Sequence, residues 1–329
     1  MSNLLGIHHV TAITDSAERN YQFFTEILGM RLVKKTVNQD DIHTYHTFFA
    51  DDEGNAGTDM TFFDFPQIPQ GSKGTNSISR VGLRVPSDEA LEYYVGRFEK
   101  YGVKHEGIQE LFHTKVKVLP FEESDGQYYQ LFSDENNQGI EGGIPWKEGP
   151  VPAKYAIYGL GPIEITVSYY NDFKQVLTNV YDMKQIVDKE SYAIFEVGKG
   201  GHGGQVILRN DQESRQALEG YGQVHHVSFR VKDQNALNKW LTKYQKMGLP
   251  NSGLVDRFYF GALYARIGHI LIELSTDGPG FMQDEPYDSL GETLSLPPKL
   301  EPQREIIESQ VRPFNTVWDK EKRNKDGND

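Results

Sequence analysis

Residues 7–13 read Ile-His-His-Val-Thr-Ala-Ile, and residues 224–230 read Val-His-His-Val-Ser-Phe-Arg. Each stretch is short, rich in β-branched residues and alternates in polarity, which is typical of a β-strand with one apolar and one polar face. The two copies stand more than 200 residues apart in the sequence. Two copies of one strand predict two copies of one folding unit.

Alternation along the first strand separates its two faces. It groups His8 with Val10 on an apolar side that suits a covering helix, and it groups His9 with Thr11 on the polar side. In the second strand, the same alternation puts His226 on the polar face, at the position that His9 has in the first strand. We therefore expect His9 and His226 at equivalent positions of one concave surface, and His8 turned toward the helix side.

Composition narrows the classes of function. The chain has 329 residues, 34 basic and 47 acidic, and its net charge of −13 disfavours a nucleic-acid or membrane partner. It has no cysteine, so His, Asp and Glu are the candidate ligands of any metal. Neither a leader peptide nor a long apolar run is recognisable, which predicts a cytoplasmic protein. A homo-oligomer is compatible with this interpretation.

The order strand, helix, three strands recurs along the chain. It predicts an α+β fold of four βαβββ modules, paired into two cup-shaped mixed-sheet barrels. The modules are expected at about residues 4–66, 77–137, 159–210 and 222–281.

The chain is expected to divide near its middle, where glycine and proline are frequent. The predicted regions are an N-terminal half (1–137), a linker (138–158), a C-terminal half (159–296) and a partly disordered extension (297–329). Within the extension, residues 319–329 have little to bury and are expected to fray, while Phe314, Val317 and Trp318 are candidates to dock on the body.

A third candidate ligand lies in the closing strand of the fourth module, predicted over residues 269–275. Its apolar face leaves Glu273 pointing into the cup together with His269. A carboxylate in so apolar a strand is costly unless it is paired or binds a metal. The alternative is an internal salt bridge to Arg230 or Arg257.

Two histidines and one carboxylate form the arrangement that leaves open positions on Fe(II) for catalysis, so His9, His226 and Glu273 are the predicted ligands. Mn(II) is the alternative metal, and Zn or another divalent ion can occupy such a site in a crystal. Because the ligands come from the first and fourth modules, these two should pair into one cup. The inner modules carry Arg80 and Pro162 near the histidine positions and should form a structural second cup, or a lid.

The chain resembles the vicinal-oxygen-chelate (glyoxalase/bleomycin-resistance/extradiol dioxygenase) superfamily, and within it the ring-cleaving hydroquinone dioxygenases. The resemblance covers nearly the whole chain. The stretches that carry it are residues 5–11, 45–51 with 57–58, 224–226, 264–273 and 278–285. It implies the same three Fe(II) ligands, namely the second histidine of each pair and the late glutamate.

The resemblance also implies supporting roles as acid–base groups or anchors of a substrate hydroxyl for His8, Thr11, Arg257 and Tyr264. From their chemistry, His8, His225 and His269 are candidates to transfer protons near neutral pH, and Tyr264 is a candidate donor. Arg257 can hold a developing negative charge. For each of them, plain packing or hydrogen bonding is the alternative.

The function implied is an Fe(II)-dependent extradiol-type dioxygenase that opens a hydroquinone-like or catechol-like ring with O2. A small aromatic diol and O2 are then its partners. One alternative is a glyoxalase-type isomerase or thiol transferase, which would need a fourth protein ligand. Phe62 or Phe63 stands where that ligand is expected, and Asp64 is the remaining candidate. The other alternative is a non-enzymatic protein that binds an aromatic compound.

Other motifs rank lower. His43 and His46 should point to opposite faces of one strand, so joint ligation is disfavoured and one of them is expected to be buried. The glycine-rich residues 198–204 are not followed by a helix pattern and predict a hairpin loop rather than a phosphate site. The aromatic residues 258, 259, 260 and 264 are candidates to line an aryl pocket.

Overall fold

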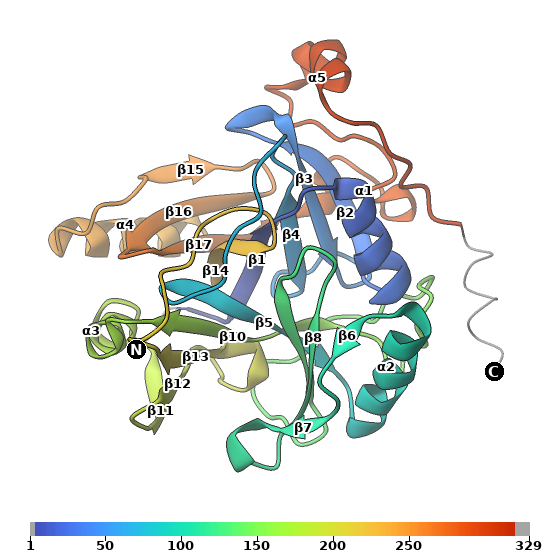
Figure 1. The fold of residues 1–329 in the computed structure, drawn as a ribbon. Coiled ribbons are helices and arrows are strands. Elements are labelled where there is room, and N and C mark those ends of the chain that lie inside the picture. Colours follow the sequence, from blue (N-terminus) through green and yellow to red (C-terminus); the bar gives the residue numbers. More distant parts are fainter. Residues whose placement is uncertain (1–3, 320–329) are drawn as a thin grey trace.

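Two mixed β-sheets form the body of the protein, and each takes strands from both halves of the chain (Figure 1). The structure is a computed structural model, and it describes residues 4–319. The first sheet has the strand order β15-β16-β17-β14-β1-β4-β3-β2, and the second has the order β11-β12-β13-β10-β5-β9-β8-β6, with β7 paired to β8. The predictions that the first module pairs with the fourth, and the second with the third, are confirmed.

The elements follow the predicted order in the first, third and fourth modules, and the second module has one additional short strand after its helix. The first contains β1 (Ile7–Ile13), α1 (Ala17–Tyr21), the π-helical η1 (Gln22–Ile27), β2 (Arg31–Asn38), β3 (Asp41–Ala50) and β4 (Asp59–Phe63). The second contains β5 (Ser77–Val85), α2 (Asp88–Tyr101), β6 (Lys104–His105), β7 (Gln109–Glu110), η2 (Leu111–His113), β8 (Lys117–Glu122) and β9 (Tyr128–Ser133). The third contains β10 (Gly159–Val167), α3 (Tyr170–Gln175), η3 (Val176–Val180), β11 (Lys184–Asp188), β12 (Tyr192–Glu196), η4 (His202–Gly204) and β13 (Gln205–Asn210). The fourth contains β14 (Gln223–Val231), α4 (Gln234–Lys246), β15 (Leu254–Asp256), β16 (Phe260–Ile267) and β17 (Ile270–Pro279). The C-terminal segment adds η5 (Phe281–Gln283), η6 (Tyr287–Ser289), η7 (Glu301–Gln303) and α5 (Arg304–Gln310).

The helices α1, α2 and α4 begin where the sequence offers a cap. The side chains of Ser16, Ser87 and Asp233 each accept a hydrogen bond from a backbone N–H of the first turn. Gly102 ends α2 in the left-handed conformation, with φ of 68°. The helix predicted to follow β1 passes without a break from α1 into the wider turns of η1.

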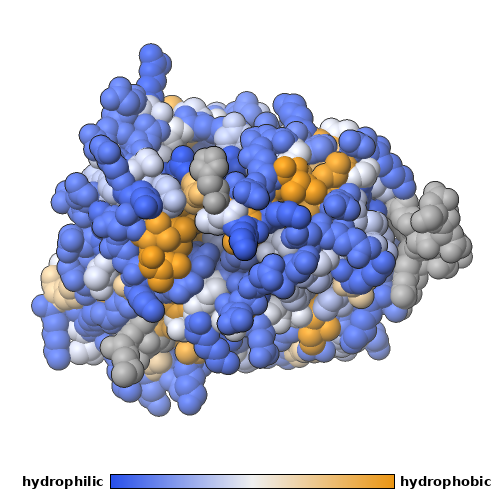
Figure 2. Space-filling model, turned by 90° about the horizontal axis from the view of Figure 1, so that it is seen from below, coloured by the Kyte–Doolittle hydropathy of each residue, from blue (hydrophilic) through white to orange (hydrophobic). Residues whose placement is uncertain are grey.

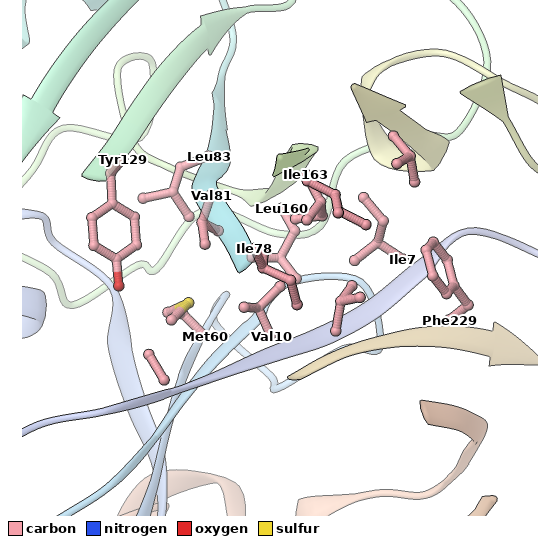
Figure 3. Packing of buried hydrophobic residues seen from close by; sticks show 14 of the residues in the cluster. Ile7, Val10, Met60, Ile78, Val81, Leu83, Tyr129, Leu160, Ile163 and Phe229 are labelled. Carbon is pink, nitrogen blue, oxygen red and sulfur yellow. The ribbon is translucent and has the colours of Figure 1, made fainter. Parts of the chain in front are cut away.

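The apolar faces of the central strands pack against each other rather than only against helices. Figure 3 shows Ile7 and Val10 of the first sheet facing Val81, Leu160 and Ile163 of the second. The shared core is therefore at the back of both sheets, and it accounts for much of the hydrophobic stabilisation. The polar faces of β1 and β14 consequently line the inside of the first cup.

A β-bulge in each central strand changes the predicted alternation. The pairing of β1 with β14 shifts register between Ile7 and His9, and again beyond Thr11, where the extra residue is His225. A bulge reverses the parity of the strand, so Ile7 joins Val10 in the core and His8 turns toward His9. The prediction that His8 faces the helix side is wrong for this reason.

The segment after β17 wraps around the first sheet and fastens its edge. Lys34 of β2 is fully buried and donates a hydrogen bond to Asp284 at 2.7 Å and another to Glu285. Two of the three predicted docking residues bind the body: the ring of Phe314 packs on Tyr45, and Trp318 packs on Trp146. The third, Val317, is 57% exposed. Residues 320–329 of the predicted frayed tail lie outside the described residues.

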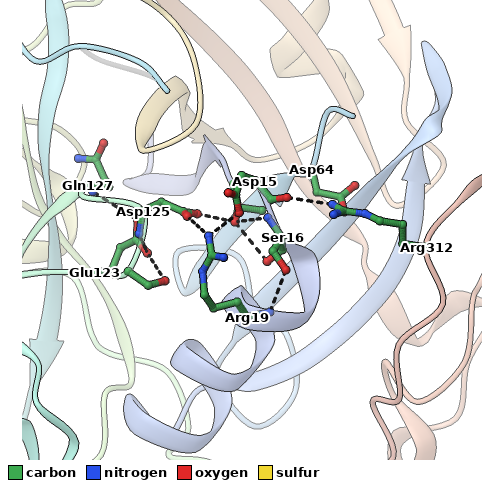
Figure 4. A network of polar contacts seen from close by, with 10 residues as sticks. Asp15, Ser16, Arg19, Asp64, Glu123, Asp125, Gln127 and Arg312 are labelled. Carbon is green, nitrogen blue, oxygen red and sulfur yellow. Dashed lines mark hydrogen bonds and ion pairs between the residues drawn. The ribbon is translucent and has the colours of Figure 1, made fainter. Parts of the chain in front are cut away.

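Polar contacts join the first module to the second. Asp125, in the turn between β8 and β9, accepts hydrogen bonds from Thr14 and Arg19 at 2.5 Å (Figure 4). Glu123 lies beside it and accepts a hydrogen bond from the backbone N–H of Asp125 at 2.8 Å.

The outer surface is mostly hydrophilic, with separate small apolar patches on the face seen in Figure 2. Among the helices of residues 4–319, none has the length and apolar character needed to cross a bilayer.

Candidate active site

Three donor side chains from three neighbouring strands meet inside the first cup. His9 comes from β1, His226 from β14 and Glu273 from β17. The Nε2 atoms of the two histidines are 3.3 Å apart, and Oε2 of Glu273 lies 3.1 Å from that of His9 and 2.8 Å from that of His226. All three residues are buried. The sequence prediction that these residues converge is therefore met, although some 260 residues separate the first from the last.

The chemistry of this donor set fits a divalent cation. Oε2 of Glu273 is buried and makes no hydrogen bond of acceptable geometry, although two imidazoles lie beside it. Burial by itself would raise the pKa of Glu273, but His9 and His226 hold this pKa well below its usual value, so the carboxylate is charged. Donor atoms about 3 Å apart suit a metal whose bonds to nitrogen and oxygen are about 2.0–2.2 Å. The alternative salt bridge from Glu273 to Arg230 is not formed, because Arg230 pairs with Asp277.

His8 determines which ring nitrogen of His9 carries the proton. The Nε2 atom of His8 lies 3.0 Å from the carbonyl oxygen of Thr276, which can only accept, so this nitrogen carries the proton. Burial and the neighbouring His9 lower the pKa of His8 to about 3, so the ring is neutral and its Nδ1 is bare. The Nδ1 of His9, 2.9 Å away, must then donate to His8. The lone pair of His9 Nε2 is left facing Glu273, as ligation requires.

The second histidine pair repeats this arrangement. The Nδ1 atoms of His225 and His226 are 2.7 Å apart, and Nε2 of His225 lies 3.7 Å from a carboxylate oxygen of Glu219. Burial and the neighbouring His226 lower the pKa of His225 to about 3, so a proton on its Nε2 leaves its Nδ1 to accept from His226. The first histidine of each pair thus orients the second.

A threonine stands where a fourth protein ligand would be. Thr11 of β1 is the equivalent of Ser228 of β14. Thr61 of β4 pairs with Thr11, just as Glu273 of β17 pairs with Ser228, so Thr61 is the equivalent of Glu273. The expectation that Phe62 or Phe63 holds this position is therefore wrong, because β4 pairs with β1 so that Thr61 lies beside Thr11 and the two phenylalanines lie beside Ala12 and Ile13. Asp64 lies elsewhere, where its carboxylate accepts hydrogen bonds from the backbone N–H of Tyr45 and from Arg312.

Thr61 connects the donor cluster to a further histidine. Its hydroxyl is 2.7 Å from that of Thr11 and 3.0 Å from Nε2 of His46, while the Thr11 hydroxyl lies 3.0 Å from Nε2 of His226. Burial and the nearby His9 and His226 lower the pKa of His46 well below its usual value. His46 is therefore neutral at physiological pH and can accept a proton.

A cavity opens in front of the three donor residues and encloses about 730 Å³, its mouth included. Aromatic side chains form much of its wall: His46, Phe48, Phe63, Phe65, Tyr259, Phe260 and Tyr264. Thr36, Asn38, Gln39 and Asp40 add polar groups. Apolar walls with a few convergent polar groups are typical of a site for a small aromatic molecule. Of the aromatic series predicted to line an aryl pocket, Phe258 alone is not part of the lining.

Arg257 and Tyr264 lie together at this cavity. Nε of Arg257 donates to the hydroxyl of Tyr264 at 3.2 Å, and the ring of Tyr264 lies edge-on to His226 with centroids 5.9 Å apart. Burial and the nearby Glu273 raise the pKa of Tyr264 well above its usual value, so the phenol keeps its proton. Arg257 lies in the loop between β15 and β16.

His269 does not join the site. It lies exposed in the turn before β17, outside the strand predicted to contain it, with Nδ1 3.3 Å from Nε2 of Gln216. The prediction that His269 transfers protons is wrong, because β17 starts one residue later and the turn directs the ring to the surface.

Sequence reasoning missed the role of His46. The histidine pair in β3 was weighed as joint ligands, and the structure separates them: His43 is exposed, while His46 faces the cavity. A signal was present, because alternation puts His46 on the same face as Phe48, and the pairing with β4 places it opposite Phe63.

The second cup lacks such a donor cluster among the described residues. The strand pairings show that Arg80 of β5 holds the position equivalent to His226 of β14. In the same way, Gln130 of β9 holds the position equivalent to Glu273 of β17. Arg80 donates to Gln130 at 2.9 Å, and an apolar cluster that includes Phe132 and Ile207 fills the rest. This supports the interpretation that the second cup is structural.

Comparison with known proteins agrees with this geometry. The family model "Glyoxalase/Bleomycin resistance protein/Dioxygenase superfamily" matches residues 6–136. The chain is 44% identical over 315 residues to "Putative ring-cleaving dioxygenase MhqA" of Bacillus subtilis, with 94% of this chain and 98% of that protein covered.

It is also 29% identical over 305 residues to the chlorohydroquinone/hydroquinone 1,2-dioxygenase of Sphingobium indicum, covering 90% of this chain and 92% of that protein. Among solved structures, a dioxygenase from Bacillus subtilis, named as putative, superposes with a TM-score of 0.86 at 30% identity, covering 96% of this chain and 99% of the other. The chain therefore belongs to the glyoxalase/bleomycin resistance protein/dioxygenase superfamily.

Proposed function

We propose that this protein is an Fe(II)-dependent dioxygenase that opens a hydroquinone-like or catechol-like ring with O2. The observation that carries the proposal is the set of three converging donors, His9, His226 and Glu273, at the floor of an aromatic cavity. Three protein ligands leave positions for a substrate and O2 on one metal. The relatives named as ring-cleaving and hydroquinone dioxygenases, which match over nearly the whole chain, support the same reaction.

His9, His226 and Glu273 would hold the metal, with Mn(II) as the alternative to Fe(II). The bound ion would supply a Lewis acid that lowers the pKa of a phenolic oxygen, together with the redox chemistry that O2 requires. His8 and His225 keep the two ligand nitrogens free of protons by accepting from the opposite ring nitrogens.

Two neighbouring groups can move or hold a proton. His46 is a neutral imidazole at the cavity wall, with Nε2 bound to Thr61, so its Nδ1 is the atom available to accept the proton of a substrate hydroxyl. The hydroxyl of Tyr264 accepts from Arg257 and lies beside the carboxylate of Glu273, and it would donate its proton to an oxygen of the substrate once a metal holds that carboxylate. Arg257 can in turn offset negative charge on that oxygen.

The cavity walls orient the ring and keep water out. Phe260 lies against both His8 and His9, with ring centroids 5.3 Å apart in each case, and so covers one side of the donor cluster. The ring of His46 packs between Phe48 and Phe63 on the other side. A planar aromatic substrate can be held between such surfaces by stacking or edge contacts.

The glyoxalase-type alternative is disfavoured by the fourth position. That reaction was expected to use a fourth protein ligand, and the matching residue here is Thr61, whose hydroxyl is already bound to Thr11 and His46. Asp64 lies outside the cluster of three donors.

An oxygen-uptake assay tests the proposal. Protein loaded with Fe(II) under anaerobic conditions is offered a panel of hydroquinones and catechols at an oxygen electrode, with His226→Ala and Glu273→Ala as site variants. We expect stoichiometric oxygen consumption and a ring-opened product for the unmodified protein and neither for the variants. Oxygen uptake by both variants at the normal rate would contradict the proposed site, and absence of uptake by the unmodified protein would support the non-enzymatic alternative.

A further inference from the structure

The two ends of the first sheet meet across the mouth of the cavity. Asp40 lies in the turn between β2 and β3, at one edge of the sheet, and Arg257 follows β15 at the opposite edge. A carboxylate oxygen of Asp40 lies 2.9 Å from a guanidinium nitrogen of Arg257, and the side-chain amide of Gln39 donates to the backbone carbonyl of Arg257 at 2.7 Å. The turn of the first module thus holds the loop of the fourth.

This contact neutralises the only strong cation of the cavity. Among the described residues that line it, Arg257 is the only lysine or arginine, and its side chain is 20% exposed. Asp40 is 70% exposed, so it presents negative charge at the rim. Apart from a bound metal, an entering molecule therefore meets aromatic walls and, at the rim, the exposed carboxylate of Asp40 with the guanidinium of Arg257 already paired to it.

We infer that Asp40 determines specificity by selecting against aromatic diols that carry a carboxylate, so that the site takes uncharged hydroquinones. Two effects act in the same direction: the carboxylate of Asp40 repels an anionic substituent, and it occupies the guanidinium of Arg257 that would otherwise bind one. This inference rests on the proposed ring-cleaving function and names the substrate class within it.

The magnitude follows from the exposure of Asp40. Since solvent screens an exposed carboxylate, we expect a change of about tenfold in relative affinity, which corresponds to about 1.4 kcal/mol. Because the rim is exposed, salt should weaken the selection.

The test compares two substrates that differ mainly in charge, 2,5-dihydroxybenzoate and 2,5-dihydroxybenzamide, in the Fe(II)-loaded protein. We expect Asp40→Asn to raise kcat/KM for the benzoate relative to the benzamide about tenfold, and cleavage of methylhydroquinone shows in each variant that the protein is still active. The control is Asp188→Asn, since Asp188 is also exposed and pairs with one partly buried cation, Lys174, at 2.9 Å, but lies in the second sheet. This control should leave the ratio of kcat/KM between the benzoate and the benzamide unchanged. In the unmodified protein, 0.5 M salt should reduce the preference for the benzamide over the benzoate.

A binding measurement separates this inference from the proposed function. Zn(II) is redox-inert, so calorimetry with Zn(II)-loaded protein gives the dissociation constants of both compounds without turnover. If Asp40→Asn leaves both the kinetic and the binding ratio unchanged while methylhydroquinone is still cleaved, the inference is overturned and the proposed function stands. If no hydroquinone is oxidised at all, the proposed function fails, and the binding ratio still decides the role of Asp40. Failure of both compounds to bind would overturn the inference as well.

Discussion

The Oε2 atom of Glu273 lies 2.8 Å from Nε2 of His226, on the neighbouring parallel strand, and no hydrogen bond of acceptable geometry joins them. A charged carboxylate in a fully buried position needs a compensating cation. The arrangement is consistent with two side chains that share a metal ion.

Glu273→Gln should therefore abolish metal binding while the fold is kept, because the amide has nearly the same shape and loses the charge. We expect the metal affinity to fall at least a hundredfold. Added Fe(II) or Zn(II) should raise the Tm of the unmodified protein by mass action but leave that of the variant unchanged. Metal content by mass spectrometry and thermal scans check this. Glu164→Gln on β10 of the second sheet is the control, and equal metal content in both variants would count against the site.

His46 should affect turnover without affecting metal content. Its Nε2 reaches Thr61 and not the donor cluster, so replacing the ring removes a proton acceptor and leaves the three ligands in place. For His46→Asn we expect kcat to fall by about a hundredfold, within the usual range for loss of a general base. Exposed His43 in the same strand provides the control, His43→Asn, with kcat close to normal. Loss of bound metal in the His46 variant would instead assign the residue to ligation.

Glu123 should make the stability of the protein depend on pH. Burial, with the neighbouring carboxylate of Asp125, raises the pKa of Glu123 to about 7, so the folded state binds its proton more tightly than the unfolded state does. Its contribution to the free energy of unfolding is therefore fully present at acid pH and falls as the pH rises through the interval from about 4.5 to about 7. The loss is at most about 3–4 kcal/mol.

Urea unfolding at pH 5 and pH 8 measures this effect. The stability of the unmodified protein minus that of Glu123→Gln should decrease from pH 5 to pH 8, because the amide does not titrate. The variant also loses an acceptor for the backbone N–H groups of Asp125 and Gln127, which lowers its stability by a similar amount at both pH values. A difference that stays constant or grows with pH would show that Glu123 ionises normally in the folded protein.

The sequence was sufficient for the architecture and the three donors, because both depend on a repeated pattern. The duplicated His-His strands indicated which modules pair, and the apolar neighbours of Glu273 indicated which way it points. The side-chain direction of His8 was mistaken, because a bulge adds a residue without leaving a mark in the amino-acid pattern. Phe62 or Phe63 was expected at the fourth-ligand position that Thr61 holds, because the register between β1 and β4 cannot be read from either strand alone. Asp40 was not found, because its contact with Arg257 joins two turns at opposite edges of a curled sheet.

Thr61→Glu should convert the open site into one with four protein ligands. Thr61 holds the position in β4 that Glu273 holds in β17, and its hydroxyl is linked through Thr11 to His226, so a glutamate at this position extends toward the cluster. We expect the affinity for Zn(II) to rise at least tenfold and oxygen uptake with hydroquinones to fall below a hundredth, because a position needed by the substrate or O2 is filled. Thr61→Gln has similar bulk without the charge and serves as the matched control, with a smaller gain in affinity. A Thr61→Glu variant with full metal content and normal oxygen uptake would contradict this prediction. Residue 61 would then not face the metal, and the two halves of the cup would be less equivalent than their strand pairings indicate.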